Sequence, residues 1–279
     1  MYYKHLFTTI AALALASTAA FADGPSVSVT ELPITATSGQ TGFVGGSVGL
    51  EYGRSTQKQN NESTELDLDH RSQSVSLEYA ATPKLAFAVD LENQSMSDGS
   101  LRAEGAVATL HGIYTLNRNV KIGAWVTSDK SLENLKIDGI NIGFPNTYGK
   151  GVEVAYKTGA LEVQGFWGTL GMENPDGPDF ALTQTGISAD YSFDRGFSLV
   201  AGMDRMSNED GAQRNQFFGG EYEMANGAVL YAQRATTSFS DSNDITSTTT
   251  SFGVRFDFGP NSGTTFRLRD MQDLVYSID

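Results

Sequence analysis

The chain has no cysteine, and after residue 22 it has no long apolar run. The missing cysteine excludes a disulfide scaffold and thiolate chemistry, but it leaves export open. The missing apolar run excludes a transmembrane helix. Basic residues are scarce as well, with 19 Lys and Arg against 33 Asp and Glu. This charge disfavours a nucleic-acid partner and favours cationic ones.

The first 22 residues are typical of a secretory signal peptide. Lys4 and His5 form a short polar start, residues 6–20 are apolar and rich in alanine, and Ala20-Phe21-Ala22 is a small-x-small cleavage site. We therefore expect 1–22 to be cleaved after Ala22. Segment 23–41 should then lie in the periplasm or partly inside the folded domain. Without Lys4 the balance is 18 bases against 33 acids, a net charge of about −15.

The dominant pattern is an alternation with period two, as in the run Val-Gly-Gly-Ser-Val-Gly-Leu-Glu-Tyr at 44–52. Successive side chains of a strand point to opposite faces, so this pattern predicts a strand with one apolar face. It recurs about twelve times. The predicted strands are 43–53, 72–81, 85–93, 105–116, 120–128, 151–157, 161–169, 183–193, 197–205, 216–224, 228–235 and 249–258.

The connections between these strands alternate in length. Five are tight and carry Gly, Asn, Asp or Pro, namely 82–84, 117–119, 158–160, 194–196 and 225–227. Six are long and polar, around 54–70, 94–104, 129–150, 170–182, 206–215 and 236–248. Short turns at one end and long loops at the other are typical of outer-membrane barrels, with the long loops outside the cell.

These features predict an all-β fold, a closed antiparallel transmembrane β-barrel of about twelve strands over residues 42–258. Fourteen or sixteen strands are the alternatives, because the tail 259–279 contains two apolar stretches that could add strands. An even number of strands places both termini in the periplasm. We therefore expect the protein in the outer membrane of a Gram-negative bacterium, surrounded by lipid.

An aromatic residue ends every second predicted strand, on the face that the apolar residues occupy. An aromatic girdle at the periplasmic membrane interface explains this placement. The girdle residues are Tyr79, Tyr114, Tyr156, Tyr191, Tyr222 and Phe258.

The charged residues of the strands fall on the opposite face, which would line a lumen. A charge facing lipid near the midplane costs about 2–4 kcal/mol for Arg or Lys, so the apolar face must be the outer one. For 228–235 either phase is defensible. The predicted pore-lining charges are eleven acids and three bases: Glu51, Glu78, Asp90, Glu92, Lys121, Glu153, Lys157, Glu162, Asp190, Asp204, Glu221, Glu223, Arg255 and Asp257.

The leader, the strand–turn pattern of 42–258 and the segment Asn-Thr-Tyr-Gly-Lys-Gly-Val-Glu-Val-Ala-Tyr-Lys at 146–157 resemble the Gram-negative porin family. The likeness is greatest to the short porin-like barrels of alphaproteobacteria. It implies passive diffusion of small hydrophilic solutes, folding by the barrel-assembly machinery and no cofactor or metal. A homo-oligomer is left open. The chain departs from general porins in its length, in the lack of inward bases on its first four strands, and in the 21 residues after Phe258.

The loop 129–150 is the longest connection and joins the fifth and sixth predicted strands, where porins fold a loop into the pore. We expect it to be the constriction loop, with Asp129, Glu133 and Asp138 as its acids. The excess of luminal acids predicts ion transport with a preference for cations, because rings of Asp and Glu concentrate cations in a narrow lumen. Glu78, Asp190, Glu221 and Asp257 should form such a ring near the periplasmic mouth.

Other functions fit less well. An outer-membrane phospholipase uses His with Ser on the lipid-facing surface, but after the leader the chain has only His70 in a predicted loop and His111 facing the lumen. Neither belongs to a catalytic or metal-binding motif, so we expect no enzyme. An autotransporter translocator would need a passenger and a luminal helix before the first strand. The main rival is a non-conducting structural or adhesive barrel that acts through its extracellular loops.

Overall fold

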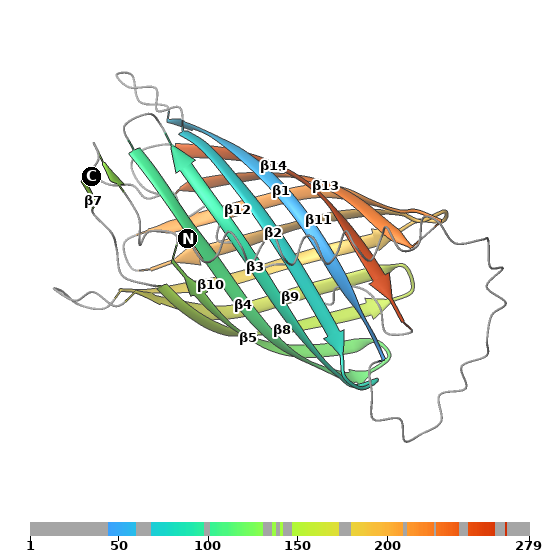
Figure 1. Ribbon diagram of the computed structural model, residues 1–279. Helices are drawn as coiled ribbons and strands as arrows, with labels where there is room; N and C mark the ends of the chain where they lie inside the picture. Colours follow the sequence, from blue (N-terminus) through green and yellow to red (C-terminus); the bar gives the residue numbers. More distant parts are fainter. Residues whose placement is uncertain are drawn as a thin grey trace, which may run out of the picture. The chain divides into compact units, whose positions relative to one another are not determined.

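Twelve long strands form the wall of a closed barrel in the computed structural model (Figure 1). The structure describes residues 44–59, 68–97, 101–130, 136–137, 140–141, 147–172, 180–208, 211–225, 227–239, 245–259 and Phe266. The expected signal peptide with its cleavage at Ala22, and segment 23–41, lie outside the described residues. Among those described, no helix has the length and apolar character needed to cross a membrane.

Each strand pairs antiparallel with its neighbour in sequence, and β1 pairs with β14 from Gly46↔Phe258 to Gln59↔Ile245. The strands of the wall are β1 (Gly45–Gln59), β2 (Leu68–Ala80), β3 (Leu85–Ser97), β4 (Leu101–Asn117), β5 (Val120–Asp129), β8 (Thr147–Thr158), β9 (Leu161–Met172), β10 (Phe180–Ser192), β11 (Phe197–Ser207), β12 (Ala212–Glu223), β13 (Ala228–Phe239) and β14 (Ile245–Phe258). The predicted twelve strands are confirmed. Because β1 and β14 close the sheet at twelve strands, the alternatives of fourteen or sixteen strands in the wall are wrong.

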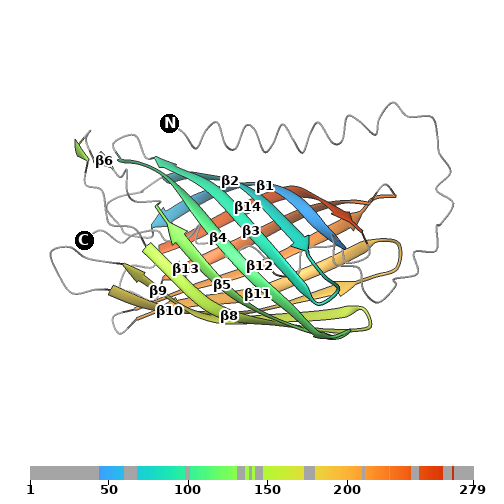
Figure 2. The same cartoon turned by 60° about the horizontal axis from the view of Figure 1, so that its bottom comes forward.

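Two very short strands, β6 (Lys136–Ile137) and β7 (Ile140–Asn141), form a small hairpin in the connection between β5 and β8. β6 pairs with the first two residues of β4, Leu101 and Arg102. The hairpin therefore lies beside the start of β4 and continues the sheet beyond the end of β5, on the side away from the tight turns (Figures 1 and 2). We call the end with the tight turns the short-turn end and the opposite end the long-loop end.

The strands are longer than predicted, mostly at the long-loop end. β1 runs on to Gln59 instead of ending at 53, and β14 starts at Ile245 instead of 249. The sequence of these extensions consists mostly of Ser, Thr, Gln and Lys, so it has no apolar–polar alternation to detect, while the backbone ladder continues. At the short-turn end the turns match the prediction. Arg195 and Gly196 between β10 and β11 both have positive φ, 74° and 76°, as in tight hairpins whose twist matches that of the strands.

The outer surface of the barrel is apolar. Large side chains that point away from the lumen are half exposed or more, including Leu110 (53%), Trp167 (54%), Phe218 (58%) and Phe252 (58%). A soluble protein rarely exposes so continuous an apolar surface, whereas a barrel embedded in lipid requires one. On β13, where either phase was defensible, Leu230 faces outward and Val229 and Tyr231 face inward.

Candidate functional site

The lumen contains a cavity of about 600 Å³, lined by strands from most of the wall. All fourteen charged residues expected in the lumen point to the inner side of the sheet, on the same face as the buried residues of their strands. Ten of them line the cavity: Glu51, Lys121, Lys157, Glu162, Asp190, Asp204, Glu221, Glu223, Arg255 and Asp257. The other four, Glu78, Asp90, Glu92 and Glu153, are buried.

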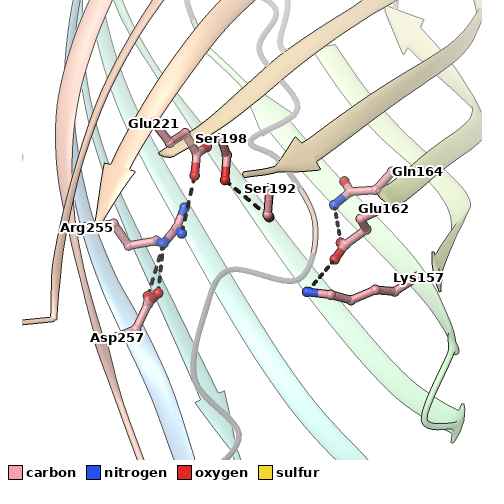
Figure 3. Close-up of polar contacts among 8 residues, drawn as sticks. All are labelled: Lys157, Glu162, Gln164, Ser192, Ser198, Glu221, Arg255 and Asp257. Carbon is pink, nitrogen blue, oxygen red and sulfur yellow. Dashed lines mark hydrogen bonds and ion pairs between the residues drawn. The ribbon is translucent and has the colours of Figure 1, made fainter. Parts of the chain in front are cut away.

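Arg255 on β14 is the centre of one cluster in the cavity (Figure 3). Its Nε lies 3.0 Å from Oδ1 of Asp257, and its Nη2 lies 3.5 Å from Oε2 of Glu221 on β12. These three side chains are each about one-fifth exposed, so they are largely buried but still in contact with solvent. Arg255 therefore partly neutralises two of the acids that we expected to act as a free ring at this end.

A second cluster lies on β8 and β9. The Lys157 ammonium is 3.6 Å from Oε2 of Glu162, and the Gln164 amide donates a 3.0 Å hydrogen bond to Oε1 of the same carboxylate (Figure 3). Lys157 is 59% exposed, so solvent screens this pair and it adds little stability. The cavity lining includes Arg118 and Asn119 of a tight turn, which the strand pattern did not indicate.

A different arrangement occupies the wall formed by β3, β4 and β8, where three ionisable groups are buried together. Nδ1 of His111 lies 2.8 Å from Oε1 of Glu153, and its Nε2 lies 3.0 Å from Oδ2 of Asp90, an ion-pair distance without hydrogen-bond alignment. All three side chains are at most 3% exposed. Neutral imidazole has a single N–H, so two carboxylate partners require one further proton on the ring or on a carboxyl group.

Gly123 on β5 allows this cluster to form. Glu153 on β8 and His111 on β4 lie on either side of β5, so the carboxylate must cross that strand. A Cβ at Gly123 would lie 2.7 Å from Oε1 of Glu153 and 2.9 Å from Cε2 of Phe266. Among the described residues, no group of three or more His, Asp or Glu side chains is arranged to hold a metal ion. His111, Asp90 and Glu153 therefore form a buried ion-paired network.

Phe266, in the tail after β14, is buried in the lumen at 3% exposure. It packs with Ala88 of β3, Ile113 of β4 and Ala155 of β8, in the half of the barrel nearer the short-turn end. Seven residues separate it from Phe258, the last residue of β14, which is three strands away from β3 in the wall. From the sequence we expected a tail or added strands in this segment, and we did not predict that Phe266 packs inside the lumen.

Aromatic side chains inside the barrel lie against inward-facing glycines of neighbouring strands. Trp125 of β5, 2% exposed, covers Gly151 of β8 and Gly168 of β9; a Cβ at Gly151 would lie 2.6 Å from its Cε2. Tyr231 likewise covers Gly253 and donates a 3.4 Å hydrogen bond to the carbonyl of Leu50. The rings therefore lie along the wall, where they occupy less of the lumen's cross-section.

Replacing Gly168 by Ala should lower the free energy of unfolding by about 1–3 kcal/mol, because overpacking forces side chains or backbone to shift. A Cβ there would collide with the ring of Trp125 and lie 2.7 Å from the carbonyl oxygen of Lys150. Gly165→Ala on the same strand is the matched control, since its nearest neighbour would be 3.6 Å away. Denaturant unfolding in detergent measures both. Equal stability of the two variants would contradict the steric role of Gly168.

The six expected girdle residues are all exposed on the outer face and close to the short-turn ends of their strands, with exposures from 38% for Phe258 to 52% for Tyr222. Phe193 and Phe197 near the same rim are exposed too. The ring of Phe193 contacts that of Tyr191 edge-on, with centroids 4.8 Å apart, and contacts that of Phe197 at 5.8 Å. These two phenylalanines flank a turn and were not part of the predicted set.

The described parts of the expected constriction loop do not show a fold into the pore. Asp129 is inward and 4% exposed, while Glu133 and Asp138 lie outside the described residues. β6 and β7 extend the sheet at β4. The constriction role stays a prediction.

No protein-family model matches the chain, and no curated protein matches its sequence. Solved structures do match. The COG4313 outer membrane channel from Pseudomonas putida F1 has a TM-score of 0.60 at 14% identity, over 76% of this chain and 96% of that one. The KdgM porin in complex with disordered oligogalacturonate has a TM-score of 0.50 at 12% identity, over 75% and 99%. The β domain of the Bordetella autotransporter Brka has the same TM-score and identity, over 76% and 99%.

The chain has the fold of outer-membrane β-barrels. At these identities the likeness concerns the fold, and the solute must be argued from the lumen. The inner face of this barrel includes a polar cavity and a buried group of residues. In that group His111 pairs with Asp90 and Glu153, and Phe266 packs with Ala88, Ile113 and Ala155.

Proposed function

We propose that the protein is an outer-membrane channel for passive diffusion of small hydrophilic solutes, with a preference for cations. The observation that carries this proposal is the cavity, whose lining includes seven acidic and four basic side chains. Apolar solutes would gain little from such a lining, whereas hydrated ions and polar molecules are accommodated without desolvating buried charges.

The sign of the lining charge supports the cation preference. With seven acids and four bases, the cavity carries a net charge of −3 if all are ionised. The Debye length at physiological salt is about 8 Å, so charges across a small barrel sense one another. Their combined field raises the local concentration of cations and lowers that of anions.

The outer-membrane placement is supported by the apolar outer surface, the exposed aromatic residues at the short-turn end, and the fold shared with the COG4313 channel and the KdgM porin. By this proposal the short-turn end faces the periplasm and the long-loop end faces the outside. The leader 1–22 would direct export, and the barrel-assembly machinery would insert the chain.

Single-channel recording in a planar lipid bilayer tests the proposal. We expect discrete conductance steps from the purified barrel, and under a KCl gradient a reversal potential of the sign set by a cation-preferring pore. Protein that inserts in folded form, as shown by its heat-dependent migration on a gel, but passes no current would overturn the channel function. Anion preference would overturn the proposed cation selectivity but not the proposed channel function.

A second candidate is the non-conducting structural barrel, and Phe266 favours it. Its ring fills space between β3, β4 and β8 inside the lumen, which narrows the path. If the protein conducts, Phe266→Ala should raise the single-channel conductance because it opens this part of the lumen. Phe252→Ala, which removes a ring from the outer surface, is the control and should leave it unchanged. Absence of current from the wild type and from Phe266→Ala would favour the structural barrel.

A further inference from the structure

The outer face of the barrel carries charge of the opposite sign to the rest of the protein. The whole chain has a formal charge of −14. Among the described strand side chains that point outward, six are basic and two, Asp69 and Glu104, are acidic. The six bases are Arg54, Arg71, Lys150, Arg205, Arg214 and Arg234. All six are exposed.

These bases are confined to one end. Each lies within five residues of the long-loop end of its strand. In the short-turn half, the outward side chains that the structure describes on the strands include no charged residue. Solvation alone would allow Arg and Lys at both membrane interfaces, because the cost of a charge on the lipid face falls to about 0–1 kcal/mol at either one. The restriction of the outward bases to the long-loop end therefore indicates an anionic partner at that end only.

The register places arginines directly opposite one another on adjacent strands. Arg54 of β1 is paired with Arg71 of β2, and Arg205 of β11 with Arg214 of β12. Like charges in such positions destabilise a sheet, since their Cβ atoms are about 5 Å apart. An anion that bridges the two guanidinium groups would offset this repulsion through charge-assisted hydrogen bonds.

One of the two pairs shows how an anion fits. The carboxylate of Asp69 bridges the first pair, with Oδ1 3.1 Å from Nε of Arg54 and Oδ2 2.8 Å from Nη2 of Arg71. The second pair, Arg205 and Arg214, makes no ion pair with another residue that the structure describes. Arg234 of β13 adds a further guanidinium. It lies opposite Thr250 of β14, and Thr250 lies opposite Arg54 of β1 on its other side.

We propose that these outward-facing arginines bind the phosphate groups of the phosphorylated glycolipid in the outer leaflet. The arginine surface is defined by Arg54, Arg71, Arg205, Arg214 and Arg234. Guanidinium groups match phosphate oxygens in bidentate geometry, and charge-assisted hydrogen bonds of this kind are about twice as strong as neutral ones. The phosphates lie at the depth where the apolar surface ends, which is where these side chains are. The inference rests on the outer-membrane placement proposed above and does not require that the barrel conducts.

Binding of a defined lipid to the purified protein in detergent tests the inference. The probes are bis-phosphorylated lipid A and the same glycolipid with its phosphates removed, titrated by native mass spectrometry. Wild-type protein should prefer the phosphorylated form. Replacing all five arginines of the arginine surface by Gln should weaken that binding about tenfold or more, as expected for lost charge-assisted hydrogen bonds.

Two further variants make the result specific. Lys84→Gln with Arg195→Gln removes two exposed charges from the short-turn end and should leave lipid binding unchanged. Arg205→Lys with Arg214→Lys keeps the charge but loses the bidentate geometry, so it should bind the phosphorylated form more weakly than the wild type and more tightly than the Gln variant. Equal binding of the two lipids by the wild type, undiminished binding by the Gln variant, or an acidic protein bound at this surface in place of lipid would overturn the inference. If the protein passes no current in a bilayer but still prefers the phosphorylated lipid, the channel function is overturned and this inference stands.

Discussion

Replacing His111 by Leu is expected to lower the free energy of unfolding by about 3–5 kcal/mol, the cost of breaking a buried ion pair. Leucine has nearly the volume of histidine but cannot contact a carboxylate favourably. Asp90 and Glu153 would then face each other across an apolar side chain at 3% exposure. Two buried carboxylates without a cation cannot both stay ionised at low cost.

The triple variant His111→Leu, Asp90→Asn and Glu153→Gln is the matched control. It removes every charge of the network and keeps the side-chain volumes, so most of the lost stability should return. Urea unfolding of the three proteins in detergent gives the comparison. If His111→Leu alone is as stable as the wild type, or if the triple variant is the least stable of the three, the ion-paired network does not stabilise the barrel as described.

The strands of the barrel wall were predictable because alternate residues face the lipid and the aqueous lumen, which require apolar and polar side chains respectively. In Val152-Glu153-Val154-Ala155-Tyr156 each outward side chain is apolar and each inward one is polar or small, so strand and phase follow together. Where both faces are in water this contrast disappears. The first residues of β14 and the last of β1 are therefore missing from the predicted strands, although the ladder includes them.

The arrangement inside the lumen was less predictable, because phase gives the face of a residue but not its partners. Glu78 shares the inward face with Asp190, Glu221 and Asp257, yet it is 6% exposed while the other three line the cavity. The partners of His111 come from β3 and β8, far away in sequence. The contact with Glu153 depends on Gly123 of β5, the strand between them, and the sequence around a single glycine does not show which side chain crosses it.

The burial of Phe266 shows the same limit more strongly. Its sequence context, Thr264-Thr265-Phe266-Arg267-Leu268, suits a strand as well as a tail. Its place in the structure depends on the small side chains Ala88 and Ala155 and on Gly123, which together leave room for a ring. The strand periodicity of those residues places them on the inner face, but it does not show that a residue from beyond β14 packs there.

Neutralising four acids of the cavity is expected to turn the cation preference into an anion preference. The variant Glu51→Gln, Asp190→Asn, Asp204→Asn and Glu223→Gln leaves three acids, Glu162, Glu221 and Asp257, against the four bases of the lining. The net charge of the cavity changes from −3 to +1. Arg255 keeps both of its carboxylate partners, so no buried cation is left without a partner and the fold is spared.

A second variant makes the net charge of the cavity more negative, so the prediction is tested in both directions. Lys121→Gln with Lys157→Gln leaves seven acids against Arg118 and Arg255, a net charge of −5, and should strengthen the cation preference. Glu104→Gln on the outer face removes an acid without touching the lumen and should change neither sign nor size of the reversal potential. Because the field in the pore depends on the summed charge of its lining, the three reversal potentials under one KCl gradient should fall in the order of net charge. A reversal potential that is the same in all three would show that the permeating ions do not pass this lining, and would remove the basis for assigning the pore to the cavity.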